Sequence, residues 1–167
     1  MKRWLLVAAL LAAAPARAAD SFIEDGFTHS RAGQWAEAAP LLRRAFELDP
    51  TRANVAAELG FVLHKLGQPR EAETFLRRAI ALDPSASYPY LSLADVLAEA
   101  PDRWRRREEI VAFLEKGLVA LKDEPGGRTW LALRLAAFER SVGMLAPAQR
   151  RLAGLLAAPD VPATLRQ

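Results

Sequence analysis

The residue types that carry most enzyme chemistry are few in this 167-residue chain and form no catalytic pattern. There is no cysteine, which excludes cysteine nucleophiles, cysteine metal sites and disulfides. The two histidines, His29 and His64, lie 35 residues apart without a flanking pattern of carboxylates, so they do not predict a zinc site. We therefore expect no metal and no cofactor.

The serines and paired carboxylates are equally uninformative as catalysts. Ser21, Ser30 and Ser92 lack the sequence context of a nucleophile elbow, and the chain has no glycine-rich phosphate loop. Glu108 and Glu109 are neighbours on a predicted helix and point in different directions, so they cannot share an acid–base task. The sequence predicts a protein that is not an enzyme, and an enzyme with an unrecognised site is the weaker alternative.

The first 18 residues have the organisation of an export signal. A short basic start at residues 1–3 precedes an apolar run over residues 4–14, and Pro15 breaks that run. Residues 16–18 have the small-x-small form that signal peptidase reads. The run is shorter than the roughly 20 residues of a membrane helix, so we expect cleavage after Ala18 and a periplasmic or secreted protein. An uncleaved N-terminal anchor is the alternative.

Removal of the leader balances the charge of the chain. Residues 1–18 contain three of the 23 basic residues and no acidic residue, which leaves 20 basic against 20 acidic side chains. A nucleic-acid-binding protein needs an excess of Lys and Arg to displace counterions. We therefore expect no nucleic-acid partner, and no later apolar run is long enough to cross a membrane.

Two segments of the chain align without a gap at a spacing of 34 residues. The first runs from Gly33 to Pro50 and the second from Gly67 to Pro84. A period in this range is the signature of a repeat protein. Apolar residues recur within each segment at three and four residues, which predicts helices and no sheet.

The period and the residue types resemble the tetratricopeptide repeat family, whose unit is a pair of antiparallel helices. The first repeat matches the family pattern at Phe22, Gly26, Trp35, Ala38, Leu42, Ala45 and Pro50. The second matches it at Ala56, Leu59, Gly60, Leu63, Ala72, Leu76, Ala79 and Pro84. Glycine inside a helix costs about 1 kcal/mol, which is reasonable where a neighbouring helix packs on the bare backbone.

The resemblance implies an all-α, right-handed α-solenoid of about four helix-turn-helix repeats. We place these repeats at about residues 19–52, 53–86, 87–124 and 127–158, with a short tail over residues 159–167. About four residues are inserted in the third repeat near Pro101–Arg105, and Pro125–Gly127 is predicted as a turn between repeats. Each pair of helices is too small to bury its apolar face alone, so stacked pairs must share one core.

The family's inward-facing positions imply a groove lined by the first helix of each pair, suited to a peptide or a partner helix. The implied partner-binding residues are Phe27, Arg31, Asn54, Phe61, His64, Lys65, Tyr88, Asp95, Trp130 and Arg140, with Ile23, Leu91 and Leu133 beside them. The alternative is that about half of these side chains pack between repeats. Phe27 and Phe61 at inward positions argue against recognition of a chaperone tail, and His29 is expected to be a core or half-buried residue.

Two further features each allow two interpretations. The basic run Arg103–Arg107 contains Trp104 and could contact an anionic lipid or polysaccharide, but it is also typical of a solvated loop that leads into a helix. The tail is too short to cover Leu152, Leu155 and Leu156. Terminal repeats normally have a polar outer face, so we expect this end to contact a partner subunit or a second copy.

These observations favour a non-enzymatic protein-binding scaffold of the bacterial cell envelope, in the periplasm, that serves assembly or secretion. That role follows from the resemblance and the leader alone. The alternative is a carbohydrate or cell-wall-ligand binding module that uses Trp104, Trp130 and Tyr88.

Overall fold

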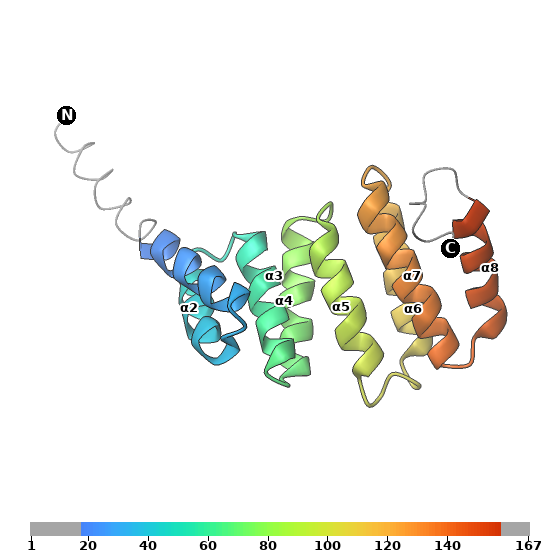
Figure 1. Ribbon diagram of the computed structural model, residues 1–167, viewed down its shortest axis with the longest axis horizontal. Coiled ribbons are helices and arrows are strands. Elements are labelled where there is room, and N and C mark those ends of the chain that lie inside the picture. The colour runs from blue at the N-terminus through green and yellow to red at the C-terminus, as the bar shows by residue number, and fades with distance from the viewer. Residues whose placement is uncertain (1–17, 158–167) are drawn as a thin grey trace. The chain divides into compact units, whose positions relative to one another are not determined.

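The computed structural model describes residues 18–157, and every regular element within them is a helix (Figure 1). The chain divides into two compact units, residues 1–82 and 83–167, which are described separately. The prediction of an all-helical chain is confirmed for this range. The predicted signal peptide, apart from Ala18, and the predicted tail lie outside the described residues.

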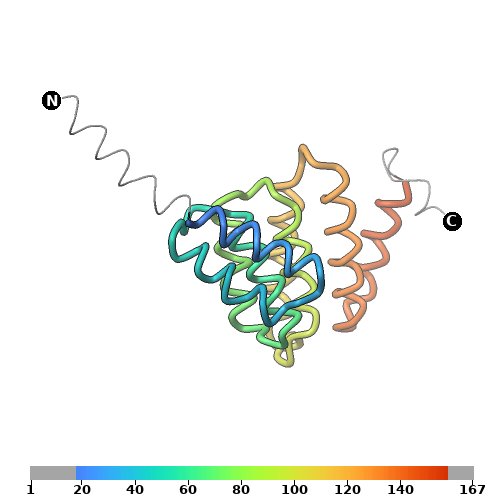
Figure 2. The backbone as a smooth tube through the Cα atoms, turned by 60° about the vertical axis from the view of Figure 1, so that its left-hand side comes forward, coloured from blue at the N-terminus to red at the C-terminus, as the bar shows by residue number. Residues whose placement is uncertain are grey.

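The first unit consists of two helical hairpins. A first helix over residues 18–31 is followed by α2 (Trp35–Leu48), α3 (Ala53–Lys65) and α4 (Pro69–Leu82). Figure 2 shows the first helix in blue running beside α2. The two hairpin turns contain Gly33 and Gly67 at φ values of 73° and 72°, which side chains disfavour. The predicted turns at both glycines are confirmed.

Close contact between the helices of each hairpin explains the glycines within them. A Cβ on Gly26 would lie 2.8 Å from the Leu42 side chain, and a Cβ on Gly60 would lie 2.6 Å from the Leu76 side chain. These pairs are one repeat apart, and both leucines are fully buried. The absence of a side chain therefore lets each pair of helices approach closely, as the sequence predicts.

The hairpins of the repeat also end in the same local structure. Asp49 follows α2, and its carboxylate accepts hydrogen bonds from the amide and hydroxyl of Thr51. Asp83 follows α4, and its carboxylate accepts the same two bonds from Ser85. These side-chain turns end the two helices at equivalent positions, immediately before Pro50 and Pro84.

The second unit contains α5 (Ser87–Glu99), α6 (Arg107–Ala120), α7 (Pro125–Ser141) and α8 (Leu145–Ala157). Turn residues 101–106 connect α5 to α6 at the predicted insertion. Gly143 lies at φ 77° between α7 and α8 and repeats the turn of Gly33 and Gly67. The core of this unit includes Leu93, Leu97, Ile110, Leu114, Leu131 and Leu135, all fully buried.

The prediction of a turn at Pro125–Gly127 is wrong, because these residues form the first turn of α7. Proline is tolerated at the start of a helix, where its missing N–H would have no partner within the helix. Gly127 is buried, and a Cβ there would lie 2.2 Å from the Cβ of Ser87. The glycine therefore allows the beginning of α7 to lie against the beginning of α5. No helix within residues 18–157 is long and apolar enough to span a membrane.

Candidate functional site

The predicted partner-binding residues all lie on the first helix of a hairpin: residues 18–31, α3, α5 or α7. We call the surface that these residues form in each unit the first-helix face of that unit. None of the ten is buried, so all are open to a partner in whole or in part. Because the two units are separate bodies, the first-helix face is described for each unit in turn.

In the first unit, Phe61 is the centre of a group of ring contacts. Its ring lies edge-on to Trp35 from α2, with centroids 5.5 Å apart at 85°. The ammonium of Lys65 lies 5.3 Å from the centre of the Phe61 ring. Phe61 is half-buried, so it both packs between hairpins and exposes part of its ring. Both predicted roles, packing and lining, therefore apply to this residue.

The other predicted residues of the first unit give its face a cationic border. Phe27 and His64 are half-buried, whereas Arg31 and Asn54 are exposed. Arg31, His64 and Lys65 all lie at the C-terminal ends of their helices. Cations there are stabilised by the helix dipole. The first unit thus offers aromatic rings beside positive charge.

The second unit offers large aromatic side chains that are strongly exposed. Tyr88 on α5 is 42% exposed and Trp130 on α7 is 50% exposed. Leu91 and Leu133, one helical turn further along the same helices, are half-buried. Helices α5 and α7 pack against each other, so these four side chains belong to one packed pair of helices. Rings that remain this exposed often mark binding surfaces.

Asp95 is less available than the sequence suggests, because it is paired with Arg134 from α7. The Arg134 Nε donates to Asp95 Oδ1 at 2.8 Å, and Nη2 donates to Oδ2 at 3.3 Å. Sequence reasoning missed Arg134, although it lies one turn after Trp130 on the same helix. Arg140 near the end of α7 is exposed.

The histidines and serines have structural surroundings. His29 is half-buried as predicted, and its Nδ1 lies 2.7 Å from Oε1 of Gln34 in the adjacent turn. Ser30 is buried and donates a hydrogen bond to Glu58. Within residues 18–157, no group of three or more histidine, aspartate or glutamate residues could hold a metal ion.

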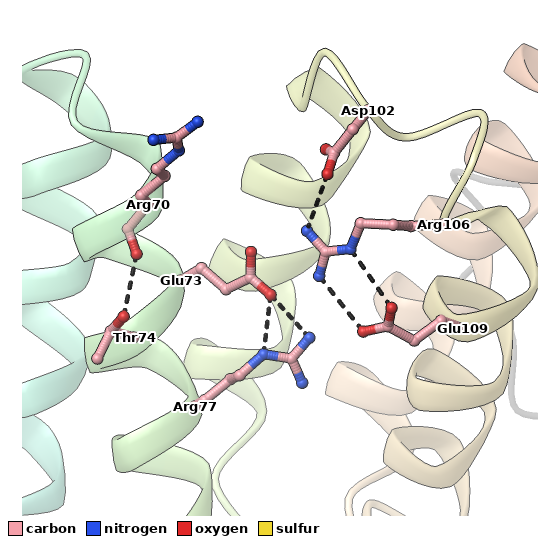
Figure 3. Close-up of polar contacts among 7 residues, drawn as sticks. All are labelled: Arg70, Glu73, Thr74, Arg77, Asp102, Arg106 and Glu109. Atoms are coloured by element: carbon pink, nitrogen blue, oxygen red, sulfur yellow. Dashed lines mark hydrogen bonds and ion pairs between the residues drawn. The ribbon is translucent and has the colours of Figure 1, made fainter.

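Most arginines of the basic run after α5 contact their own segment. Arg106 contacts Asp102 at 3.8 Å and Glu109 at 3.3 Å (Figure 3). The Arg107 guanidinium donates to the carbonyl of Trp104 at 2.9 Å, and Arg103 donates to the carbonyl of Ala100. These contacts favour the interpretation as a solvated loop that leads into α6.

Each unit also has an open hollow beside its second helices, which the sequence did not predict. In the first unit it measures about 560 Å³ and includes Pro40, Arg43 and Leu63. In the second unit it measures about 480 Å³ and includes Glu115, Glu139 and Arg151. The first-helix face belongs to neither hollow. It is an exposed helical surface, which suits a polypeptide better than a small molecule.

A family model for the tetratricopeptide repeat matches residues 30–94, which contain the turns at Gly33 and Gly67 and the packed pair Gly60 and Leu76. Residues 30–94 of the chain therefore contain tetratricopeptide repeats. Repeats of this family are typically non-catalytic interaction modules, so the fold supports a protein–protein interaction scaffold. No curated protein matches the sequence.

Solved structures of tetratricopeptide repeat proteins share the fold of this one. MamA protein superimposes with a TM-score of 0.68 at 15% identity, over 83% of this chain and 71% of that chain. Pseudomonas aeruginosa pilF gives 0.66 at 21% identity, over 91% of this chain and 66% of that chain. The second such domain of human RPAP3, solved in complex with an HSP70 peptide, gives 0.62 at 22% identity, over 75% of this chain and 98% of that domain. At these identities the similarity shows the α-solenoid fold alone.

Proposed function

We propose that this protein is a non-enzymatic scaffold of the bacterial cell envelope that binds a peptide or helix of another protein on its first-helix face. The observation that carries the proposal is the exposure of Tyr88 and Trp130 on the packed helices α5 and α7. Large, stiff aromatic side chains supply much of the binding energy at protein interfaces, and their burial by a partner would be favourable. The exposed cations Arg31 and Lys65 of the first unit add charge that can select a partner.

The complex of human RPAP3 with an HSP70 peptide is a precedent for a peptide bound by this fold. In the present chain, Phe61 fills part of the first-helix face and is held between Trp35 and Lys65. A partner must therefore pack on an aromatic surface as well as pair with cations. We infer an apolar or amphipathic segment as the ligand, and a role in envelope assembly or secretion.

Site-specific photocrosslinking tests the first-helix face. A benzophenone side chain replaces Tyr88 or Trp130 in the full chain, and a matched variant carries it at Val119 on α6, which is 72% exposed. We expect protease-sensitive adducts from positions 88 and 130 and none from position 119. Equal labelling at all three positions would contradict binding on this face. Retention on a cell-wall polysaccharide that Trp130→Ala abolishes would favour the carbohydrate-binding module instead.

The envelope location rests on the leader at residues 1–18. Fractionation of cells that express the full chain, with mass spectrometry of the product, tests this part separately. We expect a periplasmic or secreted protein that begins at Ala19. An intact chain that begins at Met1 in the cytoplasm would contradict the location and leave the binding face untouched.

A further inference from the structure

Helix α8, the last described helix, carries an apolar stripe that the described residues leave uncovered. Leu145 is 59% exposed and Leu156 is 56% exposed, and Leu152 between them is only half-buried. With Gln149 these residues follow spacings of four, three and four, so they lie along one side of the helix. This is the spacing of a seam between two paired helices.

The same positions in the first unit are covered by another helix. The turn glycines Gly33 and Gly143 set the register between α2 and α8, so Leu145 and Leu156 correspond to Trp35 and Phe46. Trp35 packs on Phe61 of α3. Phe46 packs on the small residues Ala56 and Ala57 of the same helix. By its position in the repeat, the stripe on α8 is therefore a surface on which a further helix can pack.

The charges near the stripe do not oppose a second copy of the same helix. The charged residues of α8 are Arg150 and Arg151. Arg151 is turned toward Glu139 and Glu115, at 2.9 Å from each, and Arg150 lies away from the leucines by helical spacing. An uncharged stripe offers nothing to select an acidic or basic partner, whereas leucine at both ends makes it complementary to itself.

The other end of the chain is a poor partner for this stripe. Four of the exposed residues on the first helix are polar: Ser21, Glu24, Asp25 and Thr28. Burial of these groups against leucine would cost free energy without replacing their hydrogen bonds to water. Head-to-tail association through α8 is therefore disfavoured, and a symmetric contact between two α8 helices remains.

We propose that α8 pairs with α8 of a second copy in an antiparallel arrangement about a two-fold axis. Leu145 would then pack on the partner's Leu156, and Gln149 would lie beside the partner's Leu152. A face of 13 residues is about 20 Å long, which is small beside the roughly 800 Å² per partner of a standard stable interface. The dimer is therefore reversible and concentration-dependent.

Sedimentation velocity of the full chain over a range of concentrations tests the contact. We expect the unmutated chain to shift from monomer to dimer and Leu156→Asp to remain monomeric at every concentration. Leu156 is exposed, so this change should not unfold the protein, which circular dichroism checks. Val119→Asp, on the exposed surface of α6, should dimerise like the unmutated chain. A monomer at the highest concentration, or unchanged dimerisation of Leu156→Asp, would overturn the proposal.

The absence of cysteine from the chain permits a second readout. Gln149→Cys places one thiol close to the proposed two-fold axis, and Val119→Cys places one on α6 as a control. Under mild oxidation we expect a disulfide-linked dimer from Gln149→Cys at least tenfold faster than from Val119→Cys. Equal rates for the two variants would count decisively against the α8 contact.

Discussion

The ends of α3 and α7 are built alike in backbone and differently in side chains. The turn glycines Gly67 and Gly143 follow these helices with nearly equal φ values, 72° and 77°. Four residues before each glycine stands a fully buried residue, Leu63 in the first unit and Glu139 in the second. Eight residues after each glycine stands Phe75 or Arg151. Two positions that hold apolar residues in one unit thus hold a glutamate and an arginine in the other.

The charges at the second site are satisfied by each other. Arg151 donates to both carboxylate oxygens of Glu139, at 3.2 Å and 2.9 Å, and also contacts Glu115 on α6. The hydrogen bonds to Glu139 raise the pKa of Arg151, so its charge is retained. A buried ion pair seldom adds stability over apolar residues, but loss of one partner leaves a buried charge without compensation. The same backbone geometry therefore accommodates either two apolar residues or an ion pair at these positions, provided that both residues are exchanged together.

The largest expected effect comes from breaking this pair. Arg151→Phe leaves the Glu139 carboxylate buried without its partner and should lower the free energy of unfolding by about 3–5 kcal/mol. The double variant Glu139→Leu with Arg151→Phe installs the residues of the first unit and should recover most of that loss. Urea denaturation of the four proteins of this double-mutant cycle measures the coupling. Additive losses in the double variant would show that the two sites are not equivalent.

A smaller effect is expected where the two units use different small residues. Gly26 and Gly60 pack closely on leucine in the first unit, whereas the corresponding residues of the second unit are Ala94 and Ala136. Gly60→Ala should destabilise the protein by about 1–3 kcal/mol, because its Cβ would overlap Leu76.

Gly154→Ala is the matched control for that change. No atom lies within 4 Å of a Cβ at Gly154 on α8, so alanine there should stabilise the helix by about 0.5–1 kcal/mol. Thermal unfolding measures both variants. A stabilising Gly60→Ala would mean that the hairpins of the first unit are less tightly packed than described.

The smallest expected effect concerns the turn after α2, which holds Asp49 where the turn after α6 holds buried Leu121. Hydrogen bonds from Thr51 and then Arg52 lower the pKa of Asp49 below its ordinary value of 3.8. A lowered pKa in the folded state stabilises the fold above the unfolded pKa, and this contribution is lost as the pH falls through the folded pKa.

Asp49→Asn should therefore be less stable than the unmutated protein at pH 7, with a difference that shrinks as the pH falls below the ordinary value of 3.8. Thr51→Val removes the strongest of these hydrogen bonds and should behave in the same way. Urea midpoints at a series of pH values measure the difference. A constant difference at every pH would contradict the role of the carboxylate charge.

Local rules explain why the first unit could be predicted from the sequence. Gly33 and Gly67 permit the positive φ of the turns, and Pro50 and Pro84 end helices by steric clash. These effects depend on the local backbone and not on residues far away in the sequence. The start of α7 could not be predicted in this way. Pro125 and two glycines are typical of a turn, and only the close approach of Ser87 to Gly127 explains their helical state.

The side-chain contacts of the second unit could not be predicted from the sequence for a different reason. The insertion before α6 changes the spacing between repeats, and ion pairs such as Asp95 with Arg134 depend on the resulting register of separate helices. The exposed residues of the first helices followed from the resemblance to the tetratricopeptide repeat family, and the structure leaves them unburied. Binding of a partner by these residues stays a prediction, because exposed side chains do not by themselves identify the molecule that binds them.

Hydrogen exchange tests the first-helix face most directly, using the full chain with and without the polypeptide captured at Tyr88 or Trp130. Binding should slow amide exchange in residues 18–31, α3, α5 and α7, and leave α2, α4 and α6 unchanged. Protection confined to α2, α4 and α6, beside the two hollows, would contradict binding on the first helices.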